Sequence, residues 1–328
     1  MKNNIIFDKV QYVLESAINK KRKKNFDKKT APKTFKSEAL DWLGAFVFAI
    51  VVISLLNMWG CQQFIVPTGS MEPTILGGDR LVVNKRAYGT ELYSYGPKRS
   101  DKTPKRGDVI TFYNPEYKSS GAFIESFRDL LFLGTLSIVN LNKDKEGNPL
   151  EKMFIKRAVG LPGDTVKFKD GNVYIKRYGD VEFKSEADVQ ASLKTEYSPY
   201  RAISKENYDA IRAFARSRGY SELGISAKVP SYITEDLSGL KNIKEYDYYE
   251  GEKEIEKQLH SYEPFKTETL NNITSKTYGI YVKSNHILPL GDNRDGSGDG
   301  RFFGPVDNKK INGKAFSIIF PPSHMKKL

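Results

Sequence analysis

The sequence MFIKRAVGLPGDTVKFKDGNVYIKR, residues 153–177, carries the clearest secondary-structure pattern in the 328-residue chain. Apolar and polar side chains alternate along 164–177, as they do in a strand with one buried face. The Asp170-Gly171 pair interrupts this alternation and is typical of a two-residue hairpin turn. Residues 153–161 are more continuously apolar, which favours a buried strand. The segment therefore predicts a strand followed by a β-hairpin.

Similar β-prone segments lie on both sides of it: DRLVVNK (79–85), DVITFYN (108–114) and YGIYVKSNHILPL (278–290). The intervening residues 179–278 are polar, with a helical pattern near 205–217 and an acidic, aromatic stretch at 245–258. We therefore predict a mainly β domain, a sheet or barrel formed by residues 62–178 and 279–328. An α+β insertion lobe at 179–278 interrupts it.

The charge distribution predicts a membrane anchor. The chain has 52 Lys and Arg against 40 Asp and Glu, and residues 1–40 alone hold eleven basic against four acidic side chains. The apolar run WLGAFVFAIVVISLLNMWG follows at 42–60, and a helix of that length spans about 28 Å. We predict one transmembrane helix at 41–61, with the basic segment 1–40 in the cytoplasm and the remainder outside.

Three other interpretations of this N-terminal region are weaker. A cleaved secretory signal peptide has a shorter apolar core that begins nearer the N-terminus. Few soluble core helices are apolar on every face over five turns. Basic clusters can bind nucleic acid, but this one flanks an uncharged apolar run, so no nucleic-acid partner is expected. One convincing span also excludes a polytopic channel or transporter.

The composition restricts the possible chemistry. A single cysteine excludes an intramolecular disulfide and a cysteine-built metal site, and three scattered histidines argue against a zinc centre. The sequence PTGSMEPT (67–74) holds Ser70 between a flexible glycine and flanking prolines. A serine nucleophile needs a base, and Lys156 lies in the apolar run FIKRAVG (154–160), where burial would lower its pKa. From the residues alone, a solvent-exposed Lys156 stays an open alternative.

Four segments together resemble the successive conserved boxes of the bacterial type I signal peptidases, a family of Ser/Lys serine proteases. They read VPTGSMEPTI (66–75), RGDVITF (106–112), FIKRAVGLPGD (154–164) and GDNRDGSGDGRFFGPV (291–306), and they follow a predicted anchor in the family's order. The resemblance implies a membrane-bound endopeptidase with a signal-peptidase-like β domain. It implies no metal and no cofactor. The substrates would be preprotein signal peptides cut after a small-x-small motif.

The resemblance also implies roles for individual residues. Ser70 would be the nucleophile and Lys156 the general base, while the Thr68 hydroxyl and the Ser70 N–H would form the oxyanion hole. Three further residues would support the dyad. These are Ser297, which would orient the lysine, and the ion pair of Asp299 and Arg301. The family commonly has serine where this chain has Gly300, so one hydrogen bond of that loop is in doubt.

The remaining implied features concern substrate and membrane. Positions that line the family's pockets for small side chains are occupied by Val66, Met71, Ile75, Phe154 and Ile155. Ser70 follows residue 59 by eleven positions, at most about 36 Å of extended chain, so the site would work near the membrane surface. We therefore expect a single-pass protein of the bacterial cytoplasmic membrane, in contact with lipid, with its catalytic domain on the outer face.

Two alternatives share parts of this pattern. Self-cleaving Ser/Lys repressors have a similar motif but carry a DNA-binding helix pair in place of an anchor. A membrane-tethered binding protein that has lost catalysis is the alternative from a different class, and the joint presence of Ser70, Lys156 and Ser297 argues against it. A second apolar stretch, 130–139, is too short to cross a bilayer and is open to interpretation as a strand or a membrane-dipping hairpin.

Overall fold

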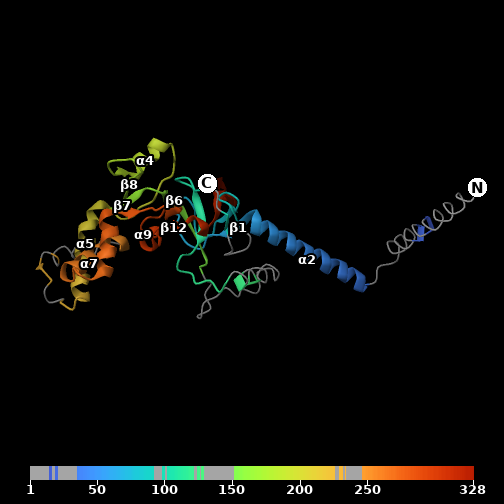
Figure 1. The fold of residues 1–328 in the computed structure, drawn as a ribbon, viewed down its shortest axis with the longest axis horizontal. Helices are drawn as coiled ribbons and strands as arrows, with labels where there is room; N and C mark the ends of the chain where they lie inside the picture. The colour runs from blue at the N-terminus through green and yellow to red at the C-terminus, as the bar shows by residue number, and fades with distance from the viewer. Residues whose placement is uncertain are drawn as a thin grey trace, which may run out of the picture. The chain divides into compact units, whose positions relative to one another are not determined.

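The computed structural model describes most of the chain beyond residue 34. The described residues are 15–16, 19–20, 35–91, 98–99, 102–121, 124–125, 127–128, 151–225, 229–231, 233 and 246–328. The chain divides into two units, Met1–Ile53 and Ser54–Leu328 (Figure 1). The apolar stretch 130–139, predicted as a strand or a membrane-dipping hairpin, lies outside the described residues.

Helix α2 (Phe35–Trp59) covers most of the segment predicted as a membrane anchor. The helix contains no proline. Glu38 lies in its first turn, where a negative charge interacts favourably with the helix dipole and stabilises the helix. Trp42 is 78% exposed and Phe48 is 70% exposed. Across the part of the chain that the structure describes, no helix meets the combined length and apolarity that a membrane crossing requires. The transmembrane anchor at 41–61 therefore stays a prediction.

The main sheet has eight strands, all paired antiparallel, which confirms a mainly β fold. Along the order β1-β2-β13-β5-β6-β11-β12, with β14 beside β13, they are β1 (Cys61–Ile65), β2 (Arg80–Asn84), β13 (Ile311–Phe320), β5 (Val109–Tyr113), β6 (Met153–Gly160), β11 (His286–Leu290), β12 (Val306–Asp307) and β14 (Lys326–Lys327). The predicted strands at 79–85, 108–114 and 153–161 correspond to β2, β5 and β6.

The predicted hairpin belongs to a second sheet of order β10-β7-β8-β9. Its strands are β10 (Ile280–Tyr281), β7 (Thr165–Lys169), β8 (Asn172–Lys176) and β9 (Lys184–Ser185). Asp170 and Gly171 connect β7 to β8 with φ angles of 49° and 68°, as a two-residue turn with positive φ requires. The hairpin prediction is confirmed. A further small sheet pairs β3 (Thr90–Glu91) with β4 (Lys98–Arg99).

The segment 179–278 is mostly helical. It contains α4 (Glu186–Leu193), η1 (Lys205–Asn207), α5 (Tyr208–Glu222), α7 (Tyr248–Tyr262) and α8 (Thr267–Tyr278). Ser185 caps α4 and Asp247 caps α7, each accepting a hydrogen bond from a first-turn N–H. In Figure 1, α5 and α7 lie side by side. The helix predicted near 205–217 is confirmed. Beyond the segment lie three short helices: α9 (Gly300–Phe303), η4 (Asn308–Lys310) and η5 (Pro322–His324).

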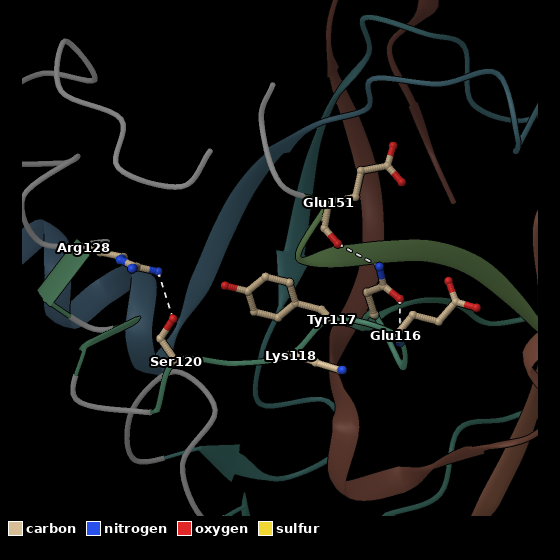
Figure 2. A pocket seen from close by; sticks show the side chains of 7 residues that line it. Glu116, Tyr117, Lys118, Ser120, Arg128 and Glu151 are labelled. Carbon is tan, nitrogen blue, oxygen red and sulfur yellow. Dashed lines mark hydrogen bonds between the residues drawn. The ribbon is translucent and has the colours of Figure 1, made fainter. Parts of the chain in front are cut away.

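An open hollow of about 540 Å³ lies between the loop after β5 and the start of β6 (Figure 2). Its lining residues are Asn114, Glu116, Tyr117, Lys118, Ser120, Arg128 and Glu151. The Asn114 side-chain amide donates to the Glu151 carbonyl at 2.9 Å. Figure 2 shows Arg128 pointing toward the Ser120 hydroxyl, to which it donates at 3.2 Å. Charged side chains of both signs face the hollow, and neither Ser70 nor Lys156 is among the lining residues.

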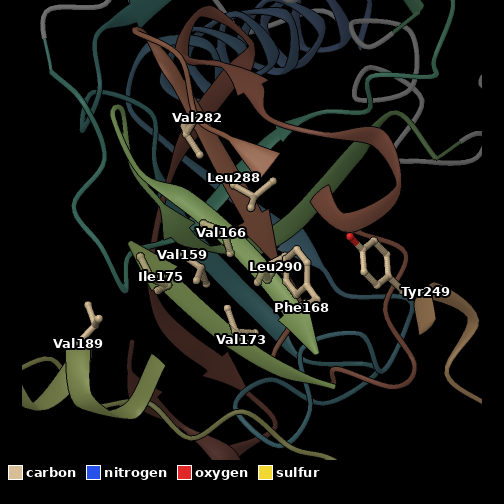
Figure 3. Packing of buried hydrophobic residues seen from close by; sticks show 10 residues of the cluster. All are labelled: Val159, Val166, Phe168, Val173, Ile175, Val189, Tyr249, Val282, Leu288 and Leu290. Atoms are coloured by element: carbon tan, nitrogen blue, oxygen red, sulfur yellow. The ribbon is translucent and has the colours of Figure 1, made fainter. Parts of the chain in front are cut away.

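Apolar side chains of the two sheets pack together in one cluster. The cluster in Figure 3 joins Val159 of β6 and Leu288 and Leu290 of β11 to the β7–β8 hairpin. Val189 of α4 and Tyr249 of α7 complete it, and the Tyr249 ring lies 5.0 Å from that of Phe168. The helical segment is thus packed against the strands that carry the candidate site.

Candidate active site

Ser70 lies in a turn between β1 and β2 whose base is closed by hydrogen bonds. The Val66 N–H donates to the Asp79 carbonyl at 2.9 Å, and the Gly78 N–H donates to the Val66 carbonyl at 2.8 Å. The buried Asp79 carboxylate accepts from the Leu76 N–H at 2.8 Å. These bonds fix the loop at both ends, so the turn holds Ser70 in one place.

Lys156 approaches this turn from β6, where it pairs with Ile110 of β5. Its Nζ lies 2.7 Å from Ser70 Oγ, within hydrogen-bonding distance. Ser70 is 7% exposed and Lys156 is 4% exposed. The fold therefore brings the predicted nucleophile and base together and excludes most water from both.

Burial lowers the pKa of Lys156 from 10.5 to about 8, because a buried ammonium loses its hydration. The carboxylates of Asp299 and Glu151 act in the opposite direction and raise this pKa, whereas the Arg301 guanidinium lowers it. A substantial fraction of Lys156 is consequently a neutral amine near pH 8. A neutral amine can accept a proton from a serine hydroxyl.

The predicted ion pair is present beside the dyad. Arg301 Nε lies 2.9 Å from Asp299 Oδ1, and both residues are buried. The other carboxylate oxygen of Asp299 accepts from the Gly291 N–H at 2.9 Å. Burial alone would raise the pKa of Asp299, but the Arg301 guanidinium and these N–H groups hold it below its usual value. Asp299 is therefore ionised and binds two parts of the same loop.

Ser297 does not make its predicted contact in this geometry. Its Oγ is buried and has no hydrogen-bond partner among the described residues. The hydroxyl packs against Gly291, where an added Cβ would lie only 2.1 Å from it. Arg301 binds the Ser297 carbonyl instead, at 3.1 Å. An orienting role for the Ser297 hydroxyl therefore requires it to turn toward Lys156, and that role stays a prediction.

Gly300, the position that departs from the family pattern, has a steric reason in this chain. A Cβ there would lie 2.7 Å from the Pro289 carbonyl oxygen and 2.8 Å from Leu288 Cδ1. A serine side chain would thus collide with β11.

The predicted oxyanion-hole threonine and the predicted pocket residues lie in different environments. Thr68 is exposed at the edge of the turn. Val66, Met71 and Ile75 are buried in one apolar cluster, and Ile155 packs against it. Phe154 belongs to a different cluster, because neighbouring residues of a strand point to opposite faces.

Phe154 packs among other aromatic rings on its own face of β6. The rings of Phe112 and Phe303 each lie 6.0 Å from it. Lys156 Nζ lies 5.5 Å from the centre of the Phe154 ring. The structure thus brings four of the predicted pocket residues together and leaves Phe154 beside the base.

Several contacts of the site were not predicted. Asn293 donates from Nδ2 to the Gly69 carbonyl and from its backbone N–H to the Ser70 carbonyl, each at 3.2 Å. Buried Arg157 pairs with Asp292, with Nε 2.7 Å from Oδ1. The Arg157 guanidinium also lies 4.4 Å from the ring of Tyr197, in the insertion. These partners lie between 40 and 224 positions apart and leave no local sequence pattern, so only the fold reveals the contacts.

Within the described parts of the chain, no group of three or more His, Cys, Asp or Glu side chains could hold a metal ion. The side chains gathered around Ser70 are a lysine, an arginine–carboxylate pair and amides. This set suits proton transfer and hydrogen bonding to a carbonyl group.

Comparison with known proteins identifies the family. Residues 39–320 match the family described as "Signal peptidase, peptidase S26". The chain belongs to this family. It is 28% identical to a signal peptidase I of Buchnera aphidicola subsp. Acyrthosiphon pisum over 92% of this chain and 82% of that protein. It is also 28% identical to a signal peptidase I of Haemophilus influenzae over 86% of this chain and 70% of that protein.

A solved structure with similarity to the chain is a crystal structure of a signal peptidase I from Enterococcus faecalis V583. It is 22% identical and covers 66% of this chain and 98% of that one, with a TM-score of 0.26. The family assignment rests on the sequence comparisons. They confirm the predicted class, an endopeptidase that cleaves signal peptides.

Proposed function

We propose that Ser70 is the nucleophile and Lys156 the general base with which this signal peptidase cleaves preproteins. The observation that carries the proposal is the 2.7 Å separation of Lys156 Nζ and Ser70 Oγ in a buried site. A base must lie within hydrogen-bonding reach of the proton that it takes. The lowered pKa of Lys156, about 8, supplies the neutral amine.

In the proposed reaction, neutral Lys156 takes the hydroxyl proton as Ser70 Oγ attacks the scissile carbonyl carbon. The resulting oxyanion is bound by the Ser70 N–H and the Thr68 hydroxyl, donors of a kind that contribute about 3 kcal/mol each. The lysine ammonium then protonates the departing amine, which leaves an acyl-enzyme ester. A water molecule, deprotonated by Lys156, hydrolyses the ester and regenerates Ser70.

The sheet offers an edge for an extended substrate. Residues 153–156 of β6 pair with β5 on one side, and β11 pairs with β6 only at Arg157 and beyond, within the described residues. A signal peptide could add as a strand along the open edge, with its small side chains toward the cluster of Val66, Met71, Ile75 and Ile155. Only small side chains would fit, because Val66, Met71 and Ile75 are already almost completely buried and leave little free volume.

We further propose that α2 anchors the protein in the bacterial cytoplasmic membrane and that the catalytic unit contacts lipid on the outer face. Exposed apolar side chains near the nucleophile turn support the lipid contact. Ile65 is 63% exposed, Phe320 is 48% exposed, and both lie opposite Arg80 in the sheet register. Leu76, in the nucleophile loop itself, is 41% exposed. Apolar groups grouped in this way favour an interface with lipid.

Cleavage of a preprotein with an Ala-x-Ala site, read by N-terminal sequencing of the product, tests the dyad. Ser70→Ala and Lys156→Ala should each abolish processing, and the double variant should be no worse, because the two groups act as a unit. Ser221→Ala and Lys309→Ala change an exposed serine and an exposed lysine and should retain wild-type activity. Substantial cleavage by either dyad variant would disprove the assignment.

A further inference from the structure

Among the described residues, the hydrogen bonds between the loop 291–295 and the nucleophile turn are made by one residue, Asn293. The Asn293 side-chain amide donates to the Gly69 carbonyl at 3.2 Å. The Asn293 backbone N–H donates to the Ser70 carbonyl, also at 3.2 Å. Asn293 therefore binds the carbonyl group before Ser70 and the carbonyl group of Ser70 itself. These two bonds restrict rotation of the Ser70 backbone.

The geometry of a peptide bond gives the first of these contacts a particular consequence. The Gly69 carbonyl and the Ser70 N–H belong to one planar trans peptide group and point in opposite directions. A hydrogen bond that fixes the carbonyl oxygen also fixes the direction of the N–H. That N–H is the backbone donor proposed for the oxyanion hole, where alignment with the developing charge determines the benefit.

The orientation of the Asn293 side chain is itself determined. Asn293 Oδ1 accepts from the Gly296 N–H at 3.1 Å, which leaves Nδ2 to face the Gly69 carbonyl. Exchanging the two amide atoms would set donor against donor at Gly296 and acceptor against acceptor at Gly69. The hydrogen-bond network thus permits only the arrangement in which Asn293 donates to the nucleophile turn.

Two residues of the segment 179–278, Glu186 and Arg201, bind the two residues that follow Asn293 in the chain. Arg294 makes two bonds to the Glu186 carboxylate, at 2.7 and 2.8 Å. The Asp295 carboxylate accepts from Arg201 Nη2 at 2.7 Å and from the backbone N–H groups of residues 202 and 203 at 2.7 and 3.0 Å. Paired charges with several hydrogen bonds fix a loop more firmly than a single contact.

Arg201 is in turn confined by its surroundings. Its guanidinium packs on the β7–β8 turn, where a Cβ on Gly171 would lie 1.3 Å from Nη1. It also donates to the Tyr208 hydroxyl, at the start of α5. The Arg201 side chain is therefore fixed between the hairpin, the helices and the 291–295 loop.

We propose that Asn293 is a positioning residue for the oxyanion hole, and that the insertion holds it in place through Glu186 and Arg201. The proposal rests on the proposed function of Ser70 and Lys156. It assigns the helical insertion a task in catalysis: the contacts of Arg294 and Asp295 keep Asn293 against the 69–70 peptide. The signal-peptidase chemistry itself does not require this role, so the two can be tested separately.

Asn293→Asp is the sharpest test because it keeps the shape and the acceptor for the Gly296 N–H while it removes the donor to Gly69. On the alkaline plateau of the pH profile, kcat should fall about 10- to 100-fold with KM little changed. A variant that changed only the pKa of Lys156 would shift the dependence of kcat on pH along the pH axis. It would leave the kcat reached at alkaline pH unchanged. Asn293→Ala carries the same expectation and serves if the aspartate prevents folding.

The insertion is tested by Arg201→Gln and Glu186→Gln, which should lower the same plateau by a smaller factor. Arg216→Gln is the matched control, since Arg216 pairs with Glu254 inside the insertion, at 3.3 Å. It should retain the wild-type kcat. Thermal unfolding of each variant separates misfolding from misalignment.

The outcomes separate the two proposals. Cleavage by the wild type that is lost in Ser70→Ala establishes the proposed function. A wild-type plateau in Asn293→Asp and Asn293→Ala would then overturn the positioning role alone. If both asparagine variants lose activity while Arg201→Gln and Glu186→Gln keep it, the part assigned to the insertion is wrong.

Discussion

The protonation state of Lys156 sets the pH range in which Ser70 can react. Its pKa is lowered by burial to about 8, so the neutral fraction rises as the pH increases through that value. We expect kcat/KM to be low in acid, to rise with pH and to be half-maximal near pH 8. A profile of kcat/KM between about pH 5 and 10 measures this directly. Full activity at about pH 6 would contradict a lysine base.

Substitution of Glu151 should shift the dependence of kcat/KM on pH without changing Ser70 or Lys156. It is exposed, and its charge raises the pKa of Lys156. Glu151→Gln should therefore shift the rise in activity to lower pH, and added salt should weaken the difference between variant and wild type. Glu116 lines the same hollow but is not among the charges that principally act on Lys156, so Glu116→Gln is the control. Equal shifts in both variants would show that Glu151 has no specific effect.

Ser297 should separate activity from stability. Its buried hydroxyl has no partner among the described residues, and an unsatisfied buried polar group costs about 1–3 kcal/mol. Ser297→Ala should thus leave the thermal unfolding midpoint unchanged or raised. If the hydroxyl turns to orient Lys156 during the reaction, turnover should nevertheless fall by about one to three orders of magnitude. A wild-type rate with an unchanged pH profile would make the role of Ser297 structural.

At the scale of elements, close packing of β6 against its neighbours predicts a sensitive glycine. A Cβ on Gly160 would lie 2.8 Å from Leu288 Cβ and 3.0 Å from a methyl of Val166 and of Val282. Gly160→Ala should lower the free energy of unfolding by about 1–3 kcal/mol through overpacking. Gly77→Ala, whose nearest added contact is 4.0 Å away, should change it by less than about 0.5 kcal/mol. Similar unfolding midpoints for both variants would contradict the packing argument.

The elements that could be predicted from the sequence are those with local signals. The Asp170-Gly171 turn and the alternation around it are properties of adjacent residues, and the hairpin appears where they predict it. Strand β1 was not predicted, because residues 61–65 continue an uncharged run and resemble the end of the anchor. Phe154 was assigned to the pockets although strand alternation places it on the face opposite Ile155.

At the scale of the whole molecule, the contacts that build the site join distant parts of the chain. Ser70 and Lys156 were predicted together only because four motifs resemble one family. The role of segment 179–278 could not be predicted, since Glu186 and Arg294 are 108 positions apart and nothing in the polar sequence around Glu186 indicates a partner in the 291–306 motif. Charged residues in a polar helical segment ordinarily indicate a solvated surface. Only the fold brings these particular charges into buried pairs.

At the scale of the whole molecule, the distribution of basic residues also predicts the orientation of the chain in the membrane. The basic segment 1–40 should stay in the cytoplasm, because lysine and arginine flanking a span are retained on that side. Cys61 is the chain's single cysteine, it is exposed, and it is the last residue of the predicted span 41–61, at the end that should face outward. A membrane-impermeant maleimide added to intact spheroplasts should therefore label the wild type. In the matched variant Cys61→Ser/Lys20→Cys the cysteine lies in the basic segment, and labelling should require permeabilised membranes. Labelling of Lys20→Cys in intact spheroplasts, with protection of Cys61, would reverse the proposed topology and place Ser70 on the side where signal peptides have not yet been translocated.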